Sequence, residues 1–407
     1  VCFRLTSPQV PHARCLPHMP DLLWLLLPVA AFAGWLAASR SAGGRRARCP
    51  DTMLGPEYFR GLDYLVNERP DKAIDVFIRM LEVTADTFET HLALGSLFRR
   101  RGEVDRAIRV HQNLVARETL STEQRTQARL ELGRDYLRAG LLDRAEGLLN
   151  ELVTEPGCRE QVLAMLLDIY QQERDWSRAL AVASQMTHVD DQPVNAVCAQ
   201  FLCEQALQAV AAHELESARE YLERALATDE RCARANIILG DMQRDAGDYQ
   251  TALSVYGRVE QQDMERLPEV LGAMAECHRI NGTSGQMVDY LYGLIARYDE
   301  ISPVLLLADL LATEQGREKA SGFLASQLDS HPSVRGLAKL IDLRLPGGNA
   351  QDEILLQGLR SLADSLQDNS VRYSCSRCGF GGKSMHWQCP GCRRWDTIRP
   401  VNGAQGV

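Results

Sequence analysis

Hydrophobic residues recur at helical spacing along most of the chain, and the clearest example is the stretch 88–117. In its first half Leu94, Gly95 and Phe98 fall on one face of a helix. In its second half the i, i+3, i+4, i+7 spacing of an amphipathic helix is kept by Ala107, Ile108, His111, Leu114 and Val115. The turn 101–103 lies between the halves, and its glycine readily takes the positive φ that ends a helix. The pattern therefore predicts two antiparallel helices, which the small residues allow to approach closely.

This helix–turn–helix unit is repeated along the chain. The position of Ala107 in the second helix recurs at Ala73, Ala145, Ala179, Ala218, Ala252, Gln286 and Ala320. Most steps between these positions are 34 residues, which is the period of the tetratricopeptide repeat. Two steps are 38 and 39 residues, and we assign their surplus to lengthened loops at 121–124 and 190–193. The seventh copy is the weakest, because Gln286 replaces the small residue and the glycines of 282–285 widen its turn.

About eight repeats thus fill residues 54–334, and two further apolar helical stretches within 335–370 predict a capping helix pair. Each repeat has an apolar face that only a stacked neighbour can cover, so the repeats should form one superhelical solenoid. The concave groove of such a solenoid commonly binds other proteins. The sequence therefore predicts an all-α fold with an extended interaction surface.

The first residues, 1–18, have no helical or strand periodicity and stand directly before Met19. We interpret Met19 as the natural start and residues 1–18 as an upstream extension. A disordered tail is the alternative interpretation.

An apolar run without a charge follows, from Leu22 to Ala38. Its 17 residues are just enough for a helix across a hydrocarbon core of about 30 Å, so we predict a transmembrane anchor at 19–39. The arginine-rich linker 40–53 follows, which by the positive-inside rule places the bulk of the chain in the cytoplasm and the short N-terminus outside. A secretory signal peptide cleaved near 31–33 and a buried helix of a soluble protein remain as alternatives.

Residues 371–399 carry the most specific chemistry of the sequence, and 400–407 follow as a tail. Four cysteines form a C-x2-C-x10-C-x2-C pattern: Cys375, Cys378, Cys389 and Cys392. Thiolates at this spacing can surround one metal ion, and tetrahedral S4 coordination suits zinc or an iron of the rubredoxin type. A site filled by four protein ligands has no open position for hydrolytic catalysis. The pattern therefore predicts a structural metal ribbon.

The ribbon is too short to build an ordinary core, so we expect the metal ion to hold it together. Around the ion we place the apolar side chains of Tyr373, Phe380, Trp387, Trp395 and Ile398. We expect Gly379 and Gly391 to supply the turn conformations of the two cysteine pairs. We assign His386 a surface or packing role, because four cysteines already fill the coordination sphere.

Charge is unevenly distributed along the chain. The net charge of the 407 residues is −9, which disfavours a general nucleic-acid binder. Residues 371–407 carry six basic residues and one acidic residue, a net charge of +5, so the remainder carries −14. The chain has no nucleophile elbow, dinucleotide fingerprint or complete zinc-protease motif, and we expect it not to be an enzyme.

Two groups of residues have plain structural interpretations. Five further cysteines are scattered on predicted helices without framework spacing, which is typical of small core residues in a reducing compartment; they are Cys158, Cys198, Cys203, Cys232 and Cys277. The cluster Arg99-Arg100-Arg101 closes a first helix. There we interpret it as solvated cations that favour the negative end of the helix dipole.

The order of an apolar anchor reading LLLPVAA, repeats containing LFRRRGEVDRAIRVHQ, and a final YSCSRCGF…WQCPGCRRWDTI resembles the lipopolysaccharide assembly protein B family. The resemblance covers nearly everything from Met19 onward. It implies a regulator in the bacterial inner membrane that limits lipopolysaccharide synthesis by promoting degradation of the LpxC deacetylase by the membrane protease FtsH. It also implies that the protein organises other lipopolysaccharide-assembly proteins. For the site, it implies Cys375, Cys378, Cys389 and Cys392 as the ligands of a rubredoxin-like ribbon with iron.

Three classes of function follow. The leading one is a non-catalytic membrane-bound adaptor, because anchor, solenoid and saturated metal site occur together. The alternative is a tetratricopeptide scaffold with a nucleic-acid-binding zinc ribbon, motivated by the charge of 371–407 and its exposed aromatic residues. The third class, an electron-transfer protein, is weakened by the ten residues between the cysteine pairs, an interval shorter than in true rubredoxins.

Overall fold

The structure is a computed structural model that describes residues 87–345 except Pro156, residues 350–368 and residues 370–401, together with Phe32, Ala33 and Asp63. The chain divides into two compact units, Val1–Glu82 and Val83–Val407, and the elements described below belong to the second. The predicted extension, linker and first repeat lie outside the described residues except for Asp63, as does the predicted anchor except for the helical Phe32 and Ala33. Within the described part of the chain, no helix has the length and apolarity needed to cross a membrane.

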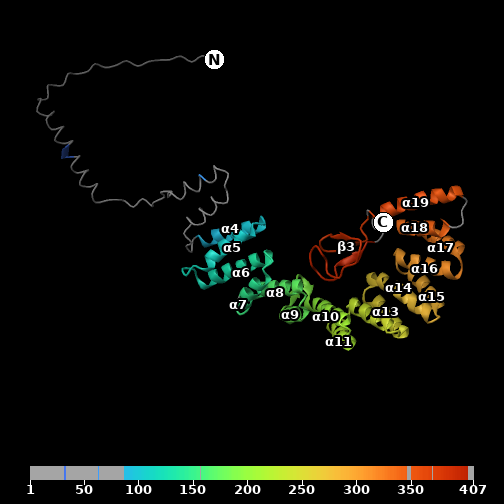
Figure 1. The fold of residues 1–407 in the computed structure, drawn as a ribbon, viewed down its shortest axis with the longest axis horizontal. Helices are drawn as coiled ribbons and strands as arrows, with labels where there is room; N and C mark the ends of the chain where they lie inside the picture. The colour runs from blue at the N-terminus through green and yellow to red at the C-terminus, as the bar shows by residue number, and fades with distance from the viewer. Residues whose placement is uncertain are drawn as a thin grey trace, which may run out of the picture. The chain divides into compact units, whose positions relative to one another are not determined.

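Helices in antiparallel succession make up most of the second unit (Figure 1). They are α4 Phe88–Arg100, α5 Val104–Val115, α6 Thr122–Arg138, α7 Leu142–Leu152, α8 Arg159–Glu173, α9 Trp176–Ala183, α10 Val194–Ala211, α11 Leu215–Thr228, α12 Ala233–Asp245, α13 Tyr249–Gln262, the 3₁₀ helix η2 Met264–Arg266, α14 Pro268–Ile280, α15 Ser284–Ile295, α16 Ile301–Glu314, α17 Arg317–Ser330, α18 Val334–Arg344 and α19 Ala350–Asp368. Each even-numbered helix from α4 to α16 packs on the odd-numbered helix that follows it, and most even-numbered helices also contact the next even-numbered one. The even-numbered helices α4 to α18 therefore form one side of the solenoid, which we call the first-helix face.

The unit that defines the repeat forms as predicted. Helices α4 and α5 are separated by the turn 101–103, and Gly102 has a φ of +84°. A Cβ atom added at Gly95 would lie 2.4 Å from the His111 ring, and Ala107 is fully buried. The close approach of the two helices therefore requires the small residues that the pattern shows, and the tetratricopeptide prediction is confirmed for this unit.

The repeat register holds in most copies and fails in the seventh. The alanines at the marker position are fully buried wherever they are described: Ala107, Ala145, Ala179, Ala218, Ala252 and Ala320. Gln286, by contrast, is exposed, and Met287 is fully buried beside it. Ser284 and Gly285 already belong to α15, so the turn is not widened. The prediction was wrong by one residue here, because a flexible methionine fills the space that alanine has elsewhere.

The two stretches interpreted as lengthened loops are regular structure instead. At 121–124, the Ser121 hydroxyl accepts the Gln124 backbone N–H while the Gln124 side chain accepts the Ser121 N–H, a capping box that starts the 17-residue helix α6. At 190–193, strands β1 His188–Val189 and β2 Gln192–Pro193 form an antiparallel hairpin. Asp190 and Asp191 turn it with φ of 49° and 64°, a left-handed conformation that aspartate tolerates.

Arg99 is not a solvated cation. Its side chain is 17% exposed and donates to Asp135 at 2.7 Å and to Glu131 at 2.5 Å. Asp135 also contacts Nδ1 of the fully buried His111 at 2.5 Å. The interpretation as a helix-end cluster was therefore wrong for Arg99, because α6 places carboxylates directly opposite it on the first-helix face.

The last helix pair, α18 and α19, has an exposed apolar surface on α19. Helix α19 packs against α18 and buries Ala363, yet Ile354, Leu355 and Leu362 are 71%, 63% and 58% exposed. Terminal helices of solenoids usually present a polar outer face. The α18–α19 pair thus differs from an ordinary cap in the polarity of its exposed side.

The C-terminal ribbon is a small antiparallel sheet after α19. Its strands are β3 Tyr373–Cys375, β4 Gly381–Gly382 and β5 Ile398–Pro400, in the order β4-β3-β5. Ser374 pairs with Gly381 on one side and with Arg399 on the other. The ribbon's own buried core consists of Tyr373, Cys375, Cys389 and Ile398.

Candidate metal centre

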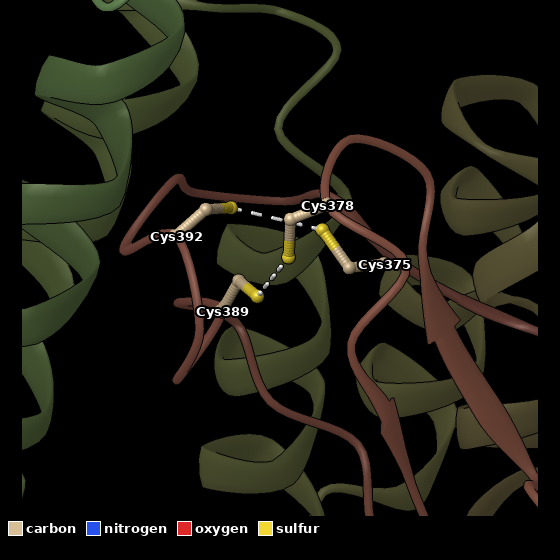
Figure 2. A group of neighbouring side chains, drawn as sticks. All are labelled: Cys375, Cys378, Cys389 and Cys392. Atoms are coloured by element: carbon tan, nitrogen blue, oxygen red, sulfur yellow. Dashed lines mark hydrogen bonds between the residues drawn. The ribbon is translucent and has the colours of Figure 1, made fainter.

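The structure brings the four predicted cysteines together from two loops of the ribbon (Figure 2). The sulfur of Cys375 lies 3.8 Å from that of Cys392, and the sulfur of Cys378 lies 3.7 Å from that of Cys389. All four sulfurs lie within 4.8 Å of one another. Tetrahedral coordination with metal–sulfur bonds of about 2.3 Å puts sulfurs about 3.8 Å apart. The residues present therefore fit one ion, and the S4 set suits zinc or iron.

Each cysteine pair is closed by a left-handed residue directly after its second cysteine. Gly379, with φ of +74°, donates its N–H to the Cys375 carbonyl at 3.0 Å. In the second pair Arg393, with φ of 58°, donates to the Cys389 carbonyl at 2.8 Å. The prediction that Gly391 supplies this conformation was wrong. Gly391 provides room instead, because a Cβ atom there would lie 3.3 Å from the Cys378 sulfur.

Hydrogen bonds around the sulfurs favour thiolate at Cys375. Burial raises the pKa of this thiol, but hydrogen bonds with the Thr397 hydroxyl, at 3.3 Å, and with backbone N–H groups outweigh it and bring the pKa to about 6. Burial raises the pKa of Cys389 to about 12. A bound cation favours the thiolate form of every ligand. His386 does not join the cysteines; its Nε2 lies 3.0 Å from the Ser384 hydroxyl, as its packing role predicts.

Two of the five apolar residues assigned to the metal site belong to a different contact. Trp395 is 4% exposed and packs against the rings of Trp176 and Phe201, with centroids 5.9 Å and 5.8 Å away. Trp387 lies under the guanidinium of Arg266 at 4.8 Å. Both tryptophans therefore face the solenoid, because the ribbon's core is too small to enclose them. Tyr373, Phe380 and Ile398 pack around the cysteines as predicted.

The first-helix face meets the ribbon with polar groups that match it. The Gln171 side chain on α8 accepts from the Trp395 indole at 2.9 Å and from Gln388 at 3.0 Å. The Gln192 side chain, on the hairpin, bonds both the N–H and the carbonyl of Trp395, at 3.3 Å and 2.9 Å. The Tyr373 hydroxyl donates to Glu269 on α14 at 2.8 Å. We call this surface, from α8 through the hairpin and α12 to α14, the docking face.

Charge pairs complete the contact. Arg266 of η2 is 1% exposed and binds Asp396 of the ribbon. In the other direction the ribbon's arginines reach solenoid carboxylates, in the pairs Arg393–Asp168 at 2.6 Å, Arg377–Asp191 at 2.9 Å, Arg394–Asp191 at 3.5 Å, Arg399–Asp263 at 3.1 Å and Arg399–Glu265 at 3.0 Å. The positive charge of the ribbon is thus largely neutralised by the acidic solenoid.

None of the docking residues of the solenoid was identified from the sequence. One signal was available, because the opposite charges of the ribbon and of the remaining chain favour contact between them. The docking also weakens the motivation for a nucleic-acid-binding ribbon. Trp395 is buried, and three of the ribbon's arginines, Arg377, Arg393 and Arg399, already bind carboxylates.

Comparisons with known proteins agree with both parts of the fold. Residues 373–400 match a family described as a rubredoxin metal binding domain, and residues 90–124 and 203–265 match tetratricopeptide repeat families. Among solved structures, a tetratricopeptide repeat protein from Parabacteroides merdae covers 69% of this chain and 100% of its own, at 13% identity and a TM-score of 0.32. This score is too low to compare arrangements.

Curated relatives match over nearly the whole chain. Lipopolysaccharide assembly protein B of Escherichia coli (strain K12) is 37% identical over 392 residues, which are 96% of this chain and 100% of that protein. Lipopolysaccharide assembly protein B of Haemophilus influenzae is 33% identical over 401 residues, 95% of this chain and 100% of that protein. With repeats and cysteine ribbon in place and full-length relatives at this identity, the chain belongs to the lipopolysaccharide assembly protein B family.

Proposed function

We propose that this protein acts in lipopolysaccharide assembly as a non-catalytic adaptor of the bacterial inner membrane. The observation that carries the proposal is the match with relatives named lipopolysaccharide assembly protein B over 96% of the chain. The apolar run from Leu22 to Ala38 would anchor it, and the arginines that follow would keep the repeats on the cytoplasmic side.

The docked ribbon would limit where partners can bind. It covers the first-helix face from α8 to α14, so the groove expected from a bare solenoid is occupied there. Partner proteins would therefore use the flanks of this face, at α4 and α6 or at α16 and α18, or the outer helices. The metal ion, when bound, would fix the two cysteine pairs and so keep Trp395 and Asp396 in position against the solenoid.

The adaptor would bring the membrane protease FtsH and the LpxC deacetylase together, and it would organise other lipopolysaccharide-assembly proteins. Holding two proteins on one membrane-bound scaffold raises their effective concentration without any new contact between them. Faster degradation of LpxC would then limit lipopolysaccharide synthesis.

The test is the half-life of LpxC in cells depleted of this protein. We expect LpxC and lipopolysaccharide to accumulate, and the full-length protein to restore both. A chain that begins near Asp51 should restore them poorly, because it lacks the anchor. Equal LpxC half-lives with and without the protein would disprove the adaptor role and leave a scaffold of other lipopolysaccharide-assembly proteins.

Topology has its own test. Protease added outside spheroplasts should leave the repeats intact, and lysis should expose them to digestion. Digestion without lysis would contradict the cytoplasmic placement and favour the secreted alternative.

A further inference from the structure

One ribbon arginine takes no part in the charge pairing of the docking face. Arg377, Arg393 and Arg399 bind solenoid carboxylates. The Arg372 guanidinium has no hydrogen bond or ion pair among the described residues, and its Cζ lies over the ring of Tyr373, 5.6 Å from the ring centroid. Arg372 lines a small cavity where the ribbon meets α14, α16 and α18.

A second arginine, Arg335 of α18, lines the same cavity. Its side chain is 25% exposed, and its nearest carboxylate, Glu300, lies 3.8 Å away, beyond hydrogen-bond distance. Glu300 bonds instead to the backbone N–H and the hydroxyl of Ser302, both at 2.8 Å. Burial and the charge of Arg372 both lower the pKa of Arg335. Among the described residues, the two guanidinium groups thus face one cavity without a hydrogen-bonded acceptor, and Arg335 has only the long ion pair with Glu300.

The space beside these arginines has two parts. The small cavity, of about 60 Å³, has roughly the volume of two water molecules and therefore suits one compact oxyanion. A larger cavity of about 720 Å³ shares Glu300, Arg335 and Val401 with it. The larger cavity has apolar walls at Ile295, Ile301, Val304 and Pro332. It is also lined by Tyr298, whose buried hydroxyl has no hydrogen-bond partner among the described residues.

We propose that these two cavities form a binding site for a small phosphate ester with an apolar group. Arg335 and Arg372 bind the phosphate, since guanidinium forks match the geometry and the double charge of a phosphate monoester. The apolar group lies in the larger cavity, against the apolar walls at Ile295, Ile301 and Val304. A carboxylate is the less suitable ligand, because it carries a single charge and offers two oxygens instead of three.

Two carboxylates of the protein limit the affinity. Glu269 and Glu300 also line the small cavity, and although both already accept hydrogen bonds, their charges offset those of the arginines. Inorganic phosphate should therefore bind more weakly than a phosphate ester, whose apolar group adds contacts in the larger cavity.

The site is assembled from both domains of the fold. Arg372 and Tyr373 come from the ribbon, whereas Arg335 and Ser302 come from the solenoid. The site is complete only while the ribbon is docked, so a ligand that bridges the two arginines stabilises the docked state by linkage.

Phenyl phosphate is a suitable probe, with the full-length protein in detergent and saturation-transfer NMR as the readout. Arg372→Gln and Arg335→Gln should each weaken binding at least about tenfold. Arg377→Gln is the matched control, because this ribbon arginine pairs with Asp191 away from the cavities, and it should leave binding unchanged. Inorganic phosphate should displace the probe, and benzoate should bind at least about tenfold more weakly.

Absence of saturable binding to the unaltered protein would overturn the proposal, as would equal binding by the two cavity variants and the control. Benzoate binding as tight as that of phenyl phosphate would overturn the assignment to phosphate. Metal content and helical circular dichroism show whether each variant is folded. If Arg372→Gln disturbs the ribbon, Arg335→Gln, which changes only the solenoid, decides the outcome.

Discussion

The solenoid and the ribbon keep their folds in different ways. Each solenoid helix buries apolar residues against its neighbours, so stability is distributed over many similar contacts. The ribbon has a buried core of four residues, two of them candidate metal ligands. It also depends on contacts with the solenoid, where its Trp395 packs on Trp176 and its Asp396 binds Arg266. A substitution in the solenoid should therefore remove only a small part of its total stability. In the ribbon, stability should depend mainly on two features, the metal ion and the docking face.

The largest effect is expected from Cys375→Ser. Loss of one ligand should unfold the ribbon, because structural metal ions contribute about 10–16 kcal/mol to such small domains, while the solenoid keeps most of its helical circular dichroism. Bound metal and resistance to protease near residue 371 should both be lost. His386→Gln is the control, since His386 lies outside the cysteine group. An unchanged metal content in Cys375→Ser would exclude this residue from the site.

Leu149→Ala tests how much stability the solenoid loses when one buried side chain is truncated. Leu149 is fully buried in α7, and truncation of such a residue lowers the free energy of unfolding by about 2–5 kcal/mol. Urea denaturation followed by circular dichroism measures the loss, and metal content should stay unchanged. Leu207→Ala, at a residue 39% exposed, should cost less than about 1 kcal/mol. Equal losses from the two variants would contradict the burial pattern.

Arg266→Met tests the docking face. The substitution keeps much of the volume but leaves Asp396 with Arg399 alone, 3.2 Å away, so we expect the docked state to lose about 2–3 kcal/mol. Faster release of metal to a chelator and a red shift of tryptophan fluorescence would report the loss. A double-mutant cycle with Asp396→Asn isolates the pair, and strictly additive effects would show that the two residues do not interact.

The smallest effect is expected from Arg377→Gln. Arg377 and Asp191 are 55% and 75% exposed, and surface pairs of this kind contribute about 0–1 kcal/mol and are screened by salt. The rate of metal release should change little, and 1 M salt should remove any difference from the unaltered protein. A loss as large as that of Arg266→Met would mean that burial does not decide the strength of these pairs.

The sequence predicted those features of the fold that depend on residues close together in the chain. Helices α4 and α5, with their turn, follow from periodicity within thirty residues, and the cysteine group follows from spacing within eighteen. The docking face could not be predicted in this way. The bond between Gln171 and Trp395 joins residues 224 positions apart, and no local spacing pattern connects them.

Errors inside the predicted elements have local physical causes. Glycine in the second cysteine pair suggested a left-handed turn, but Arg393 adopts that conformation and Gly391 makes room for sulfur. The polar character of 190–193 and the surplus length of its repeat step predict a lengthened loop there. The hairpin that forms instead has strands of two residues each, too short for any periodicity to be seen.

That hairpin determines at which repeat of the solenoid the ribbon docks. A solenoid of similar units repeats its helix geometry every 34 residues or so. Backbone geometry alone would therefore offer the ribbon several similar positions, each one repeat further along. The hairpin interrupts the series once within the described residues, between α9 and α10, and both Gln192 and Asp191 contact the ribbon there. It breaks the translational symmetry of the repeats and so defines one position at which the ribbon can dock.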